Sequence, residues 1–179
     1  MNLLWDLYWP VLTLAVVAGV NVGAIAFRKR APNQFRTINW RRRRVLVLAG
    51  GAALVLAFGA IWHAPVGKGE RFASQTERFT RKVLVDWEMA PVTAVVPRNP
   101  IRRALVLSGP ADDFQRSELV RILNDVPGVA NVWWADRPPN FTLPLLLEVE
   151  LAALVSFGVG LVLAYLLELR RRSNAQWRW

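Results

Sequence analysis

Apolar residues are gathered into three long runs, at 7–27, 45–62 and 143–169, instead of being spread along the chain. A helix needs about 20 mostly apolar residues, and at least about 17, to cross the hydrocarbon of a bilayer. The first and third runs approach or reach that length, and the shorter second run contains no charge. The pattern predicts a membrane α-helical protein with three transmembrane helices and an extramembrane stretch, 63–142, between the second and the third.

Residues 63–142 have the mixed pattern of a small α+β domain. Helical spacing of apolar and charged residues predicts a helix over 71–89, and aliphatic runs predict strands at 90–96 and 104–107. Asp112 or Asp113 can cap a second helix, whose buried face is expected to hold these residues: Phe114, Leu119, Val120, Ile122 and Leu123. A last strand is predicted at 129–134, and Gly109 and Gly128 fall where turns need unusual backbone angles.

Basic residues are concentrated between the first two runs and after the third, which predicts the direction of crossing. Short loops rich in Lys and Arg are retained in the cytoplasm, and none of these residues precedes Pro10. We therefore expect a bacterial inner-membrane protein with its amino terminus and residues 63–142 in the periplasm, and with a basic loop (28–44) and tail (170–179) in the cytoplasm. The residues assigned to topology and lipid headgroups are Arg28, Lys29, Arg30, Arg41, Arg42, Arg43, Arg44, Arg170, Arg171 and Arg172.

Lys and Arg outnumber Asp and Glu by 23 to 13. Such an excess of positive charge suggests nucleic acid or anionic lipid as a binding partner. The run 41–44 directly adjoins a span, so anionic headgroups are expected and nucleic acid is not. The chain has no cysteine and one histidine, His63. We expect no catalytic, cofactor-binding or metal-binding residues, no small-molecule substrate and no enzymatic activity.

Small residues recur every four positions in each run, on one face of each predicted helix. Such faces let helix backbones approach closely, either within the chain or against another protein, and the spacing does not separate these two cases. Asn21, deep in the first span, is expected to hydrogen-bond to a neighbouring helix. The predicted packing residues are Ala15, Gly19, Gly23, Ala49, Ala53, Ala57, Ala152, Ser156, Gly160 and Ala164.

Trp133 and Trp134 stand next to each other in the last predicted strand. Adjacent strand residues face opposite sides, so one ring is expected in the core and the other at a periplasmic contact surface.

The stretches 103–109, 119–123 and 126–132 resemble the second half of a BON domain, in which a strand ending in Ser-Gly precedes a helix and Val-Pro-Gly-Val leads into the closing strand. The resemblance implies a small αβ module of the bacterial envelope that binds phospholipid or partner proteins, without catalytic residues. Pro110 and the two tryptophans depart from the family pattern.

The absence of chemistry within the chain favours a non-catalytic accessory subunit of a larger inner-membrane complex, photosynthetic or respiratory by analogy, with other membrane subunits and anionic lipids as partners. One alternative is a stand-alone envelope protein whose BON-like domain binds headgroups or cell-wall components. Another is a subunit of a channel or transporter, which the scarcity of polar residues in the spans disfavours.

Overall fold

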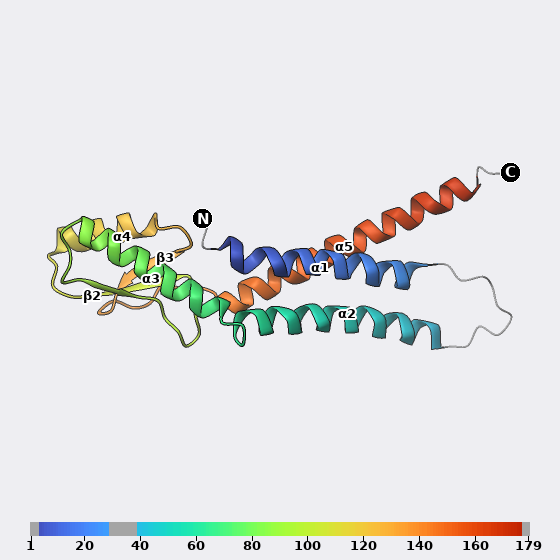
Figure 1. Cartoon of the computed structure of the whole chain (residues 1–179), viewed down its shortest axis with the longest axis horizontal. Coiled ribbons are helices and arrows are strands. Elements are labelled where there is room, and N and C mark those ends of the chain that lie inside the picture. The colour runs from blue at the N-terminus through green and yellow to red at the C-terminus, as the bar shows by residue number, and fades with distance from the viewer. Residues whose placement is uncertain (1–3, 29–38, 177–179) are drawn as a thin grey trace. The chain divides into compact units, whose positions relative to one another are not determined.

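The computed structural model describes residues 4–28 and 39–176. Two compact units are formed by the chain, a helix unit (9–60 and 149–179) and an αβ unit (1–8 and 61–148). Within the described residues the elements are, in chain order, α1 (Trp5–Phe27), α2 (Asn39–His63), α3 (Lys68–Asp86), β1 (Thr93–Val95), β2 (Ala104–Ser108), α4 (Asp113–Asn124), β3 (Asn131–Trp134) and α5 (Leu145–Gln176). All of them except β1 are labelled in Figure 1.

Helices α1, α2 and α5 are each long and apolar enough to cross a membrane, at Trp5–Phe27, Trp40–His63 and Leu145–Asn174. This agrees with the three predicted spans. Two of these helices extend beyond their apolar runs. Arg41 to Arg44 form the first turns of α2 and Arg170 to Arg172 continue α5, so the predicted basic loop and tail are partly helical. Arginine is a good helix former, and a helix need not end where its apolar run ends.

The αβ unit contains a three-stranded sheet in the order β1-β2-β3. Strand β1 pairs antiparallel with β2, and β2 pairs parallel with β3, with Leu105 opposite Val132 and Leu107 opposite Trp134. Strand β1 is shorter than the predicted 90–96, since Pro91 and Pro97 stand close to its two ends and cannot donate to a ladder.

One face of the sheet is covered by α3 and α4. Leu84 of α3 and Leu123 of α4 are fully buried in a common cluster with Leu105, Leu107 and Trp134 of the sheet. Helix α3 begins three residues before the predicted position and ends at Asp86, followed by Glu88 with a positive φ of 58°. The burial of alternate strand residues on this face explains the β-strand pattern of the sequence.

Helix α4 begins with a complete capping box. The Asp112 carboxylate accepts the Gln115 N–H at 2.7 Å, and the Gln115 side chain accepts the Asp112 N–H at 3.1 Å. The prediction that Phe114 is buried is wrong, because its side chain is 75% exposed. Phe114 precedes the buried Leu119 by five positions, which on a helix places it about 140° away from the core-facing stripe.

Both predicted turn glycines are confirmed. Gly109 has φ 135° and Gly128 has φ 97°, a range that residues with a Cβ seldom adopt. A Cβ at Gly109 would also lie 2.8 Å from the carbonyl oxygen of Pro91. The backbone therefore requires glycine at the end of β2 and in the turn before β3.

Candidate functional site

The predicted small-residue stripes of α1 and α5 pack against each other. Ala15 is fully buried, and Gly19 lies so close to α5 that an added Cβ would overlap the carbonyl oxygen of Phe157. At Gly160 an added Cβ would overlap the carbonyl oxygen of Val16, and at Gly23 it would lie 2.5 Å from the Cβ of Ala164. These two helices use their small residues for contact inside the chain.

The α5 stripe differs from its prediction at two positions. Ala152 and Ser156 are only half-buried, whereas Ala153 and Phe157 are buried beside Gly160 and Ala164. Each step of four residues turns a helix by about 400°, so a stripe of fours rotates away from a straight partner by about 40° per step. The buried positions of α5 stay on one face because one of their intervals, from Phe157 to Gly160, is three residues instead of four.

The α2 stripe is on the other side of its helix from the packed face. Ala49, Ala53 and Ala57 are all exposed, and the buried positions of this helix include Val55 and Gly59. A Cβ at Gly51 would lie 2.6 Å from a methyl group of Val22 and 3.2 Å from the Phe157 ring, so this face meets both α1 and α5. Of the two possibilities that the spacing left open for Ala49, Ala53 and Ala57, packing within the chain is not seen in the structure. Only 11% of the most apolar window of α2 is buried, against 28% for α1 and for α5.

Asn21 does not bind a neighbouring helix. Its Nδ2 donates to the carbonyl oxygen of Val17 at 2.8 Å, one turn earlier in α1, and its side chain is exposed. Thr13 behaves in the same way and donates to the Trp9 carbonyl oxygen at 2.8 Å. The local bond satisfies part of the amide, which lowers the cost of a polar side chain at that depth.

Glu148 joins the starts of two helices to the sheet within the αβ unit. Its Oε2 accepts a hydrogen bond from the Tyr8 hydroxyl at 3.0 Å and lies 3.3 Å from a guanidinium nitrogen of Arg103. The Arg103 Nε also donates to the Gly128 carbonyl oxygen at 2.9 Å. The first turns of α1 and α5 are thereby tied to the residue just before β2 and to the turn before β3. Sequence spacing gave no sign of this cluster.

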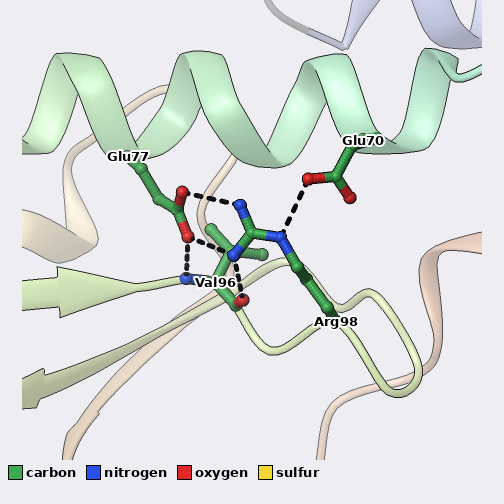
Figure 2. A network of polar contacts seen from close by, with 4 residues as sticks. All are labelled: Glu70, Glu77, Val96 and Arg98. Atoms are coloured by element: carbon green, nitrogen blue, oxygen red, sulfur yellow. Dashed lines mark hydrogen bonds and ion pairs between the residues drawn. The ribbon is translucent and has the colours of Figure 1, made fainter.

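A second polar network fixes the start of the β1–β2 connection to α3 (Figure 2). The Arg98 guanidinium donates to both oxygens of Glu77 at 2.8 Å, and its Nε donates to Glu70 at 2.8 Å. Glu77 also accepts the Val96 N–H at 2.9 Å. The Arg98 hydrogen bonds lower the pKa of Glu77 despite its partial desolvation, and the bonds to Glu77 and then Glu70 raise the pKa of Arg98. Arg98 thus pairs with two carboxylates of α3, one of which also binds the backbone of Val96, and this arrangement indicates a structural role.

Both Trp133 and Trp134 are buried, so the prediction that one ring forms an exposed contact surface is wrong. The alternation itself is present, because Trp134 belongs to the core cluster and Trp133 faces the other side of the sheet beside Val106. Trp133 is nevertheless only 9% exposed. The Trp134 Nε1 donates to the Arg116 carbonyl oxygen at 3.2 Å, and the Arg116 guanidinium lies over its ring. The exposed aromatic side chains of the αβ unit include Phe114 and Phe141 instead.

The basic residues lie at one end of α1, α2 and α5. Arg28, Arg41, Arg42 and Arg43 are exposed, Arg44 is half-buried, and Arg170 and Arg171 are exposed. Arg172 donates to Glu168 at 3.0 Å and to the Phe27 carbonyl oxygen at 2.8 Å. Lys29 and Arg30 lie outside the described residues.

Among residues 4–28 and 39–176, no group of three or more His, Asp or Glu side chains is placed to hold a metal ion. Comparisons with protein-family models, curated proteins and solved structures found no match to this chain.

Proposed function

We propose that this protein is a non-catalytic accessory subunit of a larger bacterial inner-membrane complex. The observation that carries the proposal is the exposed alanine face of α2, formed by Ala49, Ala53 and Ala57, beside a packed face formed by Gly51, Val55 and Gly59. Van der Waals packing contributes to the association of helices in lipid, and small residues favour it because they let the helix backbones approach closely. The packed face is used inside the chain, and the alanine face is suited to a helix of another subunit.

The proposed direction of insertion places the amino terminus and the αβ unit in the periplasm and the arginine-rich ends of the helices in the cytoplasm. The concentration of Arg28, Arg43 and Arg44 at one end of α1 and α2 supports this direction. The likeness of residues 103–132 to a BON domain supports an envelope location for the αβ unit. These residues form β2, α4 and the start of β3, with Gly109 and Gly128 at the two turns.

The αβ unit would brace the complex on the periplasmic side. This role is supported by the folded sheet of the unit and by the polar network within it, in which Glu148 bonds to both Tyr8 and Arg103.

Two variants, one on the exposed alanine face of α2 and one on α5, test the subunit proposal. Ala53→Leu adds bulk to the alanine face, and Gly158→Leu adds bulk to α5 at a position where no atom lies within 4 Å. After gentle solubilisation the variants are compared by native sizing. The Ala53→Leu variant is expected to migrate near the monomer mass, whereas the Gly158→Leu variant and the unaltered chain are expected to remain in a larger species with the same co-purifying proteins. A monomeric, monodisperse unaltered chain would overturn the proposal.

The direction of insertion is tested by single cysteines, which the chain allows because it has none of its own. Phe141 of the αβ unit is 85% exposed, and Ser173 near the end of α5 is also exposed. On intact cells whose outer membrane is permeabilised, an impermeant maleimide should label Phe141→Cys and leave Ser173→Cys unlabelled until the inner membrane is opened. The reverse labelling pattern would show the opposite insertion.

A further inference from the structure

A pocket lies between the end of α1 and the start of α2. It is lined by apolar residues that include Ile25 and Val47, by Arg28, which directly follows α1, and by Trp40, Arg43 and Arg44 of α2. On α2 these residues occupy positions 40, 43, 44 and 47, which is the spacing of one helix face. Three cations and an indole therefore share this pocket with apolar side chains.

The arginines of this pocket have no anionic partner within the described residues. No carboxylate of residues 4–28 and 39–176 lies within ion-pair distance of Arg28, Arg43 or Arg44, and none of the three guanidinium groups donates a hydrogen bond there. Glu168, the acidic residue at this end of α5, is paired with Arg172. A half-buried guanidinium such as Arg44 keeps up to five donors, which favours the binding of an anion with several oxygens.

Arg44 is held in place by aromatic rings and not by an acid. Its guanidinium carbon lies 5.0 Å from the centre of the Phe27 ring and 5.7 Å from the centre of the Trp40 ring. Stacking of this kind orients the planar fork and leaves its N–H groups available. The pocket is thus organised before an anion arrives, which reduces the entropy that binding must overcome.

We propose that Arg28, Arg43, Arg44 and Trp40 bind the headgroup phosphate of an anionic phospholipid, whose acyl chains lie along Ile25 and Val47. The position favours lipid over other phosphates, since both helices are long and apolar enough to span a bilayer and the pocket lies where their apolar stretches end. Basic pockets between transmembrane helices are known to bind anionic headgroups in this way. A soluble phosphate could bind to the arginines but would leave the apolar side chains of Ile25 and Val47 uncovered.

The chain contains a matched control for this site. Arg41 and Arg42 are exposed on the same first turns of α2 and do not line the pocket, so R41Q/R42Q removes the same charge as R43Q/R44Q. The purified full-length protein in neutral detergent is titrated with phosphatidylglycerol, and with phosphatidylcholine of the same acyl chains, and bound lipid is counted by native mass spectrometry. Circular dichroism checks that both variants are folded.

The expected result is a saturable phosphatidylglycerol site that phosphatidylcholine does not fill, weakened at least fivefold more by R43Q/R44Q than by R41Q/R42Q. R28Q, which removes the cation that directly follows α1, should also weaken the site, and this variant tests the proposal if R43Q/R44Q does not fold. Equal weakening by the two double variants would mean general attraction to basic residues and would overturn the proposal. Displacement of the lipid by millimolar inorganic phosphate would also overturn it, because the site would then recognise phosphate alone.

Discussion

The contact between α1 and α5 predicts a large difference between two glycines only two positions apart. An alanine Cβ at Gly160 would overlap the Val16 carbonyl oxygen and lie 2.9 Å from the Cα of Gly19, and backbone atoms cannot turn aside as a side chain can. An alanine at Gly158 meets no atom within 4 Å. Both replacements give the same gain in helix propensity, so the difference between them measures the helix contact.

Gly160→Ala should therefore force α1 and α5 apart, with the cost of an overpacked core, roughly 1–3 kcal/mol. We expect the free energy of unfolding of Gly160→Ala to lie about 2 kcal/mol below that of Gly158→Ala, which is about a 30-fold change in the equilibrium constant. Reversible unfolding in mixed micelles with a rising fraction of dodecyl sulfate measures both values. Agreement of the two variants within about 0.5 kcal/mol would refute the close contact. The double variant Gly19→Ala/Gly160→Ala should cost less than the sum of its parts, because the two glycines face the same contact.

The αβ unit gives three further predictions, each measured by thermal unfolding of the full-length chain. Glu77→Gln should lower stability by about 1 kcal/mol at pH 7 through the loss of bonds to Arg98. Since the folded pKa of Glu77 is depressed, its contribution is present above the ordinary value of 4.5 and is lost as pH falls below it, and Glu77→Gln should flatten that loss. Gly109→Ala should cost more than Gly67→Ala, because both have positive φ but only the first would meet backbone atoms; equal costs would contradict this. Asp112→Ala removes the capping box and should cost about 1 kcal/mol, whereas no change would mean that water replaces the cap.

The elements were predictable because their signals are local. Helix α4 follows from an acidic cap and apolar residues at helical spacing, and β2 follows from an aliphatic run that ends in Ser108-Gly109. The three long helices follow from the length of their apolar runs. The full length of the helices was not predictable from these signals. The first turns of α2 contain Arg41 to Arg44, which have a good helix propensity but do not belong to an apolar run.

The packed face of α2 was not predictable because that helix carries two candidate faces. Ala49, Ala53 and Ala57 form one stripe at intervals of four, and Gly51, Val55 and Gly59 form another about 200° away. Only the neighbouring helices decide between them, and they lie against the glycines, which admit the closest approach. The ion pairs of Arg98 were not predictable either. Its partners Glu70 and Glu77 share a face of α3, but they are far from Arg98 in the sequence and come close to it only in the folded unit.

The two proposals place different partners on opposite faces of α2, which makes their tests independent. Arg44 and Trp40 lie on the same side of the helix as Gly51 and Val55, so the lipid pocket continues the packed face. Ala53 lies on the other side. R43Q/R44Q should therefore reduce bound phosphatidylglycerol without releasing the co-purifying proteins, and Ala53→Leu should release those proteins without reducing bound lipid. A variant of either face that lost both partners would mean that the lipid is held between subunits, and the pocket would then have to be completed by the complex.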